Sequence, residues 1–188
     1  MKPSLYGAGA EYALHSLLIL AGQTEPVSVR DLAAFQEIPE RFLAKLFTRL
    51  RKANLVKGTE GIAGGFVLAV PADRIRFIDV LEAVDPGRIL FACAEIRRNC
   101  ALYDGTPPEW ATRGMCRIHA FMSEAEHALK IHLASKTLAD LAGEFGCKAP
   151  PKFLRDADLW FRDRKDKRTR RADDRPSATK KVIKRRES

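Results

Sequence analysis

The sequence predicts a mainly α-helical fold with a small β wing: a winged helix-turn-helix DNA-binding domain followed by a long dimerisation helix. Three observations predict it. Apolar residues recur at helical spacing through most of the chain. Residues 28–53 encode a short helix, a tight turn and a longer amphipathic helix, which is the pattern of a helix-turn-helix. Residues 54–70 then hold two β-prone stretches joined by glycines, and a hairpin in that place is a wing.

The first helix is expected over residues 9–23, "GAEYALHSLLILAGQ". Apolar side chains are spread around most of its surface, as expected of a buried helix: Tyr12, Leu14, Leu17, Leu18 and Leu20. Two polar residues, Glu11 and His15, are separated by four positions. That spacing places both on one face of the helix.

The helix-turn-helix is expected to start at Ser28, which stands at an N-cap position with Asp31 supporting the first turn. Residues 29–35 form the short helix, and "QEI" is the connection. Pro39 suits the first turn of the second, recognition helix. In the hairpin that follows, "NLVKG" and "GFVLAV" are joined through Gly58, Gly61, Gly64 and Gly65.

The recognition helix is expected to enter the major groove while the wing tip lies against the backbone or the minor groove. Residues 28–61 hold seven basic against four acidic residues, an excess that fits DNA contact. Phe42 and Leu46 are expected to pack inward. The alternative is that Arg49, Arg51 and Lys52 form only the solvated face of a helix. The candidate DNA contacts are Ser28, Arg30, Pro39, Glu40, Arg41, Lys45, Arg49, Lys57, Thr59 and Gly61.

After the wing, residues 71–85 predict a short helix, and residues 115–146 predict a long one. The long helix carries an apolar stripe: Ile118, Phe121, Met122, Ala125, Leu129 and Leu133. A long helix that projects from a small domain with its apolar stripe uncovered needs a partner to bury that stripe. A second copy of the chain is the simplest partner, so we expect a homodimer. The alternative is that the stripe folds back on the first helix.

Charge is concentrated at the C-terminal end of the chain. Residues 162–188 hold thirteen basic and five acidic residues, a net of +8 out of +9 for all 188 residues. We expect residues 147–188 to be a disordered basic tail that adds salt-sensitive attraction to phosphates or serves only solubility. The remaining boundaries are expected at 1–86 for the DNA-binding domain and 87–146 for the cysteine loop and dimerisation helix.

Several function classes are excluded by the motifs that the chain lacks. It has no run of eighteen apolar residues and no basic leader followed by a hydrophobic core, so we expect a cytoplasmic protein without membrane contact. It has no nucleophile elbow, phosphate-binding loop or zinc-protease motif, so we expect no enzyme.

Three of the four cysteines, Cys93, Cys100 and Cys116, lie in one polar segment that ends at His119. In a reducing compartment, clustered cysteines are more often metal ligands or redox thiols than structural disulfides. Zinc is a weak alternative, because three cysteines and a histidine at these loose spacings make a poor zinc finger.

The chain resembles the Rrf-two (Rrf2) family of bacterial winged-helix regulators over about residues 5–145. The resemblance rests on "EYALHSLLILA", "VSVRDLAAFQEIPERFLAKLFTRLRKANLV", "GGFVLA", "IDVLEAVD" and the cysteine loop, in this order. It implies a dimeric transcription factor, usually a repressor, that binds a double-stranded DNA operator and often carries an iron-sulfur cluster. Many members have Arg before the wing glycine, whereas this chain has Glu60 before Gly61, and an acid there repels phosphate.

The resemblance implies two sets of cluster ligands. In one, Cys93, Cys100, Cys116 and His119 hold the cluster within one subunit. In the other, Glu11 and His15 from one subunit meet Cys93 and Cys116 of its partner, as in a redox-sensing subgroup with a 2Fe-2S cluster. We favour the second set, with 2Fe-2S as the cofactor and 4Fe-4S, or no cluster, as alternatives. The signal is then redox state, nitrosative stress or iron-sulfur supply; the rival function is a cluster-free regulator switched by thiol and disulfide chemistry or by a small molecule.

Overall fold

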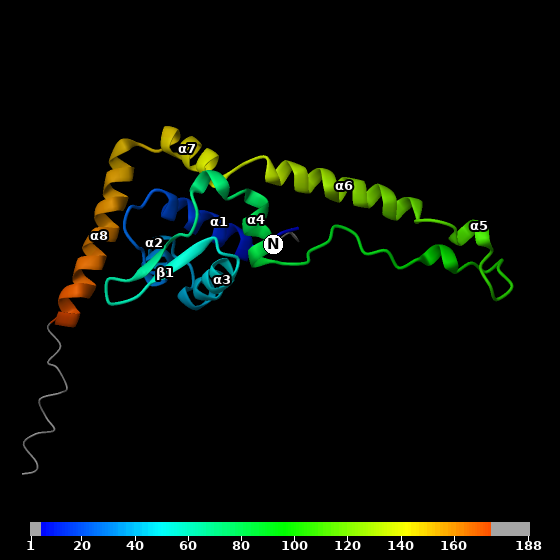
Figure 1. Cartoon of the computed structure of the whole chain (residues 1–188), viewed down its shortest axis with the longest axis horizontal. Coiled ribbons are helices and arrows are strands. Elements are labelled where there is room, and N and C mark those ends of the chain that lie inside the picture. The colour runs from blue at the N-terminus through cyan, green and yellow to red at the C-terminus, as the bar shows by residue number, and fades with distance from the viewer. Residues whose placement is uncertain (1–4, 174–188) are drawn as a thin grey trace, which may run out of the picture.

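The computed structural model describes residues 5–173. Figure 1 shows a helical body with a small hairpin, a long arm that projects from the body, and a C-terminal helix along the opposite flank. The elements in chain order are α1 (Ala8–Ala21), α2 (Val29–Phe35), α3 (Glu40–Lys52), β1 (Val56–Thr59), β2 (Gly65–Leu68), η1 (Ala72–Arg74), α4 (Phe77–Val84), η2 (Ile96–Arg98), α5 (Glu109–Thr112), α6 (Arg117–Ala134), α7 (Leu138–Lys148) and α8 (Pro151–Asp173). The predicted fold class, mainly helical with a two-stranded wing, is confirmed.

The core of the body lies between α1, α2, α3 and α4. Its fully buried side chains include Leu17, Leu32, Leu43 and Phe47. On α1 the buried face is made by Ala10, Ala13, Ser16, Leu17 and Leu20, which recur every three or four residues as one side of a helix requires. The first helix is therefore buried on one face, while its remaining apolar residues are partly covered.

Local capping sets the helix-turn-helix as the sequence predicts. The Ser28 hydroxyl accepts a hydrogen bond from the Asp31 backbone N–H at 3.1 Å and caps α2. Pro39 is the residue that precedes α3. Leu46 is buried as expected. The expectation for Phe42 is wrong, because its ring is 41% exposed and stands edge-on to Tyr12, with centroids 5.8 Å apart.

The wing is a two-stranded antiparallel hairpin in which Val56 pairs with Leu68 and Thr59 pairs with Gly65. Gly65 is required by packing, because a Cβ there would lie 2.5 Å from the backbone of Val27. Val27 in turn forms a bridge to Phe66. The hairpin is thereby joined to the start of the helix-turn-helix and is positioned by it.

The long helix expected over residues 115–146 is two helices, α6 and α7. The break has a local cause: the Thr137 hydroxyl accepts from the Asp140 N–H while the Asp140 carboxylate accepts from the Thr137 N–H, which is a capping box. Leu138 N–H also donates to the Ile75 carbonyl at 2.8 Å, which ties α7 to the body.

The apolar stripe of α6 is largely uncovered within the described part of the chain. None of its residues is buried, and Ile118 and Phe121 are 65% and 70% exposed. Only Leu133, near the end of α6, packs against the core. The alternative in which the stripe folds back on α1 does not occur in this structure, because it is α7 that contacts α1.

The expectation of a disordered tail over 147–188 is wrong for its first part. Residues 151–173 form α8, and the rings of Trp160 and Phe161 contact Phe35 of α2 with centroids 5.1 and 4.8 Å away. Asp31, also on α2, pairs with Arg164 and Arg168. This charged segment therefore packs against the body through its two aromatic rings and through the buried carboxylate of Asp31. Residues 174–188 lie outside the described residues.

Within residues 5–173, no helix has both the length and the apolar character needed to cross a membrane.

Candidate metal centre and nucleic-acid interface

The exposed face of α3 presents a basic surface suited to a DNA groove. Arg41 and Lys45 are exposed one turn apart, so both side chains point to the same side of the helix. Arg49 is placed differently, because its guanidinium donates to the backbone carbonyl of Val84 and so joins α3 to α4. Of the three basic side chains expected to contact DNA from the recognition helix, Arg49 is therefore engaged with α4, whereas Arg41 and Lys45 are exposed.

Two further predicted DNA contacts have structural duties. The Ser28 hydroxyl donates to the Asp31 carboxylate at 2.7 Å in addition to capping α2. The Thr59 hydroxyl donates to the Gly65 carbonyl at 3.2 Å and accepts from its N–H at 3.1 Å, which closes the hairpin. The other predicted contacts are exposed around the helix-turn-helix and the wing: Arg30, Pro39, Glu40, Lys57 and Gly61.

The arm has an outgoing limb, residues 86–108, and a returning limb formed by α5 and α6 (Figure 1). Hydrogen bonds join the limbs at two levels. Leu90 N–H donates to a carboxylate oxygen of Glu126 at 3.0 Å, near the body. Arg97 donates to the Gly114 carbonyl at 2.6 Å, farther out. Cys93 and Cys116 lie between these levels and so are held on limbs with a fixed separation.

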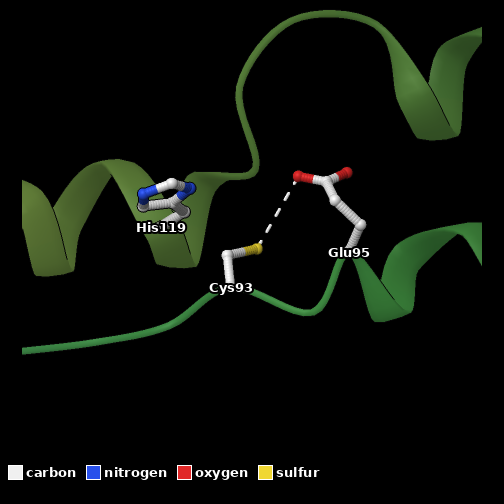
Figure 2. Close-up of side chains that lie close together, drawn as sticks. All are labelled: Cys93, Glu95 and His119. Atoms are coloured by element: carbon white, nitrogen blue, oxygen red, sulfur yellow. Dashed lines mark hydrogen bonds between the residues drawn. The ribbon is translucent and has the colours of Figure 1, made fainter.

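Cys93, Glu95 and His119 come together at this position (Figure 2), with one ligand atom from each within 4.8 Å of the others. Cys93 and Glu95 come from the outgoing limb, and His119 comes from the first turn of α6. The Cys93 thiol lies 3.6 Å from Glu95 Oε1. Thiol, carboxylate and imidazole are all groups that can bind iron.

Glu95 is oriented by its own backbone and by Arg97. Its φ of 51° and ψ of 36° place it in the left-handed region, so the chain turns back and both Cys93 and Glu95 face the returning limb (Figure 2). Arg97 Nε donates to Glu95 Oε2 at 2.8 Å, and this hydrogen bond is the main reason that the pKa of Glu95 is lowered. Glu95 was missed by the sequence reasoning, although an acid two residues after Cys93 was a signal.

Cys116 is the N-cap residue of α6. The backbone N–H groups of His119, first, and of Ile118 lower the pKa of its thiol, and a hydrogen bond with the Cys93 thiol acts in the same direction. A helix N-terminus stabilises a thiolate because its free N–H groups and its dipole favour negative charge. The site therefore contains two neighbouring thiols, of which one is poised to ionise.

Other predicted ligands do not join this group in the described protomer. Cys100 is exposed near the end of the arm, and among the described residues the group of possible metal ligands contains neither it nor Glu11 and His15. Glu11 and His15 are exposed on α1, four positions apart as predicted. The structure thus brings together Cys93, Glu95 and His119, places Cys116 three residues before His119 at the start of the same helix, and leaves the two α1 residues exposed on the body.

Comparison with known proteins gives this architecture a family. The Rrf2 family model, described as an iron-dependent transcriptional regulator, matches residues 6–144. Protein rrf2 of Nitratidesulfovibrio vulgaris is 34% identical over 134 residues, which cover 70% of this chain and 83% of that protein. The transcriptional regulator IscR of Cereibacter sphaeroides is 40% identical over 86 residues, which cover 45% of this chain and 56% of that protein.

Solved structures agree on the fold. T. potens IscR superposes with a TM-score of 0.57 at 22% identity, covering 82% of this chain and 96% of that one. CymR of B. subtilis, called a global cysteine regulator, superposes with a TM-score of 0.53 at 26% identity, covering 77% of this chain and 98% of that one. From the family match over most of its length and from its winged fold, the chain belongs to the Rrf2 family of helix-turn-helix transcriptional regulators, which are DNA-binding proteins and not enzymes.

Proposed function

We propose that the protein is a cytoplasmic homodimeric repressor that senses redox or nitrosative state, or iron-sulfur supply, through an iron-sulfur cluster on the arm. The observation that carries the proposal is the meeting of Cys93, Glu95 and His119 across the two limbs, with Cys116 at the N-terminus of the helix that bears His119, where the pKa of its thiol is lowered. Clusters are held by thiolates, so a site that favours ionised sulfur fits them. In this proposal residues 1–86 bind DNA and residues 87–146 carry the sensor and the dimer contact.

The cluster is held, in our preferred scheme, by Cys93 and Cys116 of one protomer together with Glu11 and His15 of the partner subunit. Two observations support a ligand set shared between copies. The arm projects from the body (Figure 1) with its α6 stripe uncovered. Glu11 and His15 are exposed on α1 at a spacing that lets both reach one ligand. The favoured cluster is 2Fe-2S, for which two thiolates and two oxygen or nitrogen ligands suffice.

A ligand set within one protomer is the alternative, and the proximity of His119 and Glu95 to Cys93 favours it. The two schemes are separated by substitutions. If the shared set holds, His15→Ala and Glu11→Ala each change the visible absorption of the cluster, whereas Cys100→Ala and His119→Ala leave it largely unchanged. The opposite pattern establishes the set within one protomer.

A bound cluster supplies a charge that changes by one electron or disappears when the cluster is lost. The chain's own residues convert that change into geometry. Cys93 and Cys116 lie on opposite limbs, so a cluster that both would hold links the limbs, and the limbs join the body through α4 and α6. A dimer reads two half-sites about one turn of DNA apart, so a small change in how the arms fix the two bodies alters operator affinity.

Thiol switching without a cluster is a second candidate, supported by the lowered pKa of the Cys116 thiol, which lies on the limb opposite Cys93. In that reaction the two thiols form a disulfide and pass two electrons and two protons to an oxidant such as a peroxide. Colour separates the candidates. Protein purified without oxygen is brown under the cluster proposal, and its visible absorption is lost in Cys93→Ala. Colourless protein with two free thiols, oxidised reversibly with a change in DNA binding, supports the switch instead.

The experiment that tests the cluster proposal is an absorption and Mössbauer spectrum of anaerobic protein, followed by DNA-binding titrations with the cluster reduced, oxidised and removed. Cys147→Ala is a matched thiol control, because Cys147 is exposed on α7 and belongs to neither ligand set. Iron absent from anaerobic protein, or operator affinity equal in all three states, rejects the sensing proposal.

A further inference from the structure

The C-terminal half of α8 is strongly basic and lies outside the part of the chain that matches the Rrf2 family, which ends at residue 144. Residues 162–172 contain seven basic and two acidic residues. The basic residues are Arg162, Arg164, Lys165, Lys167, Arg168, Arg170 and Arg171. A DNA-binding function carried by the winged helix alone leaves this helix unexplained.

The direction of α8 is fixed by its contacts with α2. Trp160 and Phe161 contact Phe35 at the C-terminal end of α2. Arg164 Nε donates to Asp31 Oδ1 at 2.9 Å, and Arg168 also donates to the Asp31 carboxylate. Asp31 lies one turn nearer the start of α2 than Phe35. As α8 advances, its contacts therefore move toward the N-terminus of α2, so the two helices run antiparallel.

Positive charge is left in excess where the two helices meet. The carboxylate of Asp31 is only 5% exposed and is shared by Arg164 and Arg168. Arg30, which the sequence predicts to contact DNA, lies close enough to Arg168 that, after burial, it is a cause of the lowered pKa of that guanidinium. Two arginines thus share a single carboxylate, and a third arginine lies near one of them, beside the helix-turn-helix.

Beyond Arg168, α8 continues for another turn that carries Arg170 and Arg171. Both residues are exposed, and neither has an ion-pair partner among the side chains that the structure describes. Because the helix is antiparallel to α2, this turn extends past the end of α2 where Arg30 lies. Elements at that end of a helix-turn-helix are the ones that approach the phosphate backbone.

We propose that the C-terminal half of α8 is a second DNA-contacting element, which binds backbone phosphates that flank the half-site read by α3. The inference rests on the proposed DNA-binding function and adds a surface to it. Arginine guanidinium groups form charge-assisted hydrogen bonds with phosphate and displace condensed counterions. The contact therefore adds affinity and salt dependence without reading base sequence.

The test compares full-length variants on a duplex that wild-type protein selects from a random-sequence pool. Arg170→Ala/Arg171→Ala removes two charges from the end beside α2, and Lys152→Ala/Arg155→Ala removes two exposed charges from the opposite end of α8. The first variant should lose about one unit of the slope of log K against log salt for each phosphate contact. The second should keep the wild-type slope, and Arg170→Lys/Arg171→Lys should keep most of it.

Shortening the flanks of the duplex gives an independent reading. Wild-type affinity should fall when the flanking base pairs are removed, and Arg170→Ala/Arg171→Ala should be insensitive to their removal. An unchanged slope in this variant, or an equal loss in the Lys152 and Arg155 variant, overturns the α8 proposal. If wild-type protein selects no duplex at all, the DNA-binding proposal itself fails, so the two failures are distinguishable.

Discussion

Removing the ring of Phe161 tests whether α8 is an integral part of the fold. The ring is 5% exposed, lies 4.8 Å from the ring of Phe35 and 5.0 Å from that of Trp160, and belongs to the core. Truncation of a buried Phe to Ala costs about 3–5 kcal/mol. Because α8 lies at the edge of the core and can partly resettle, we expect Phe161→Ala to lower the free energy of unfolding by about 3 kcal/mol.

Leu159→Ala is the matched control, because Leu159 lies on the same helix and is 62% exposed. We expect a loss of about 0.5 kcal/mol or less for it. Urea unfolding followed by circular dichroism measures both variants. Hydrogen exchange of the α8 amides shows whether the helix detaches before the body unfolds. If Phe161→Ala matches Leu159→Ala in both the urea midpoint and the exchange of α8, the docked position of α8 is refuted.

Three further predictions concern charges. Asp31→Ala should lower the free energy of unfolding by about 3 kcal/mol, since it leaves two partly buried arginines without their carboxylate. In the same urea titration Arg162→Met, which breaks only a surface ion pair, should lower it by less than about 1 kcal/mol. Arg41→Ala/Lys45→Ala should weaken operator binding and flatten its salt dependence by about one unit per phosphate contact; unchanged affinity and slope mean that the recognition surface is misplaced. The pKa of Asp79 is lowered, because hydrogen bonds from Arg76 outweigh the opposing effect of burial. The carboxylate therefore stabilises the fold above its ordinary pKa, and this contribution is lost as the pH falls through the lowered value. The difference in the free energy of unfolding between wild type and Asp79→Asn should be constant above about pH 5 and shrink in acid.

Elements built by short-range chemistry could be predicted from the sequence. The Ser28 cap is made within four residues of chain, and Gly65, the first residue of β2, permits the close approach to Val27. The break between α6 and α7 was also readable from Thr137 and Asp140, which form a capping box. Apolar spacing continues across the break, so periodicity alone predicts a single helix there.

The candidate site was predicted in part. Cys93, Cys116 and His119 are named from residue type and spacing, and two of them, Cys93 and His119, lie together on the arm with Glu95. The place of Glu95 was not foreseen, because it depends on a left-handed backbone and on Arg97. In the proposed shared ligand set, Glu11 and His15 come from a second chain, so their four-residue spacing is the only part of that arrangement that one sequence supplies.

By itself, the sequence determined the helix-turn-helix, the wing and the set of candidate sulfur ligands, because capping, turn chemistry and amphipathic periodicity act between residues close in the chain. Only the tertiary structure decided the place of α8 and the duty of Arg49. Phe161 contacts Phe35 of α2. Arg168 pairs with Asp31 across 137 residues of sequence, and Arg49 donates to the Val84 carbonyl 35 residues away. A helix as charged as α8 stays in solvent unless other elements offer partners for its aromatic rings and arginines. Here the partners are Phe35 and Asp31 of α2, which only the folded chain brings beside α8.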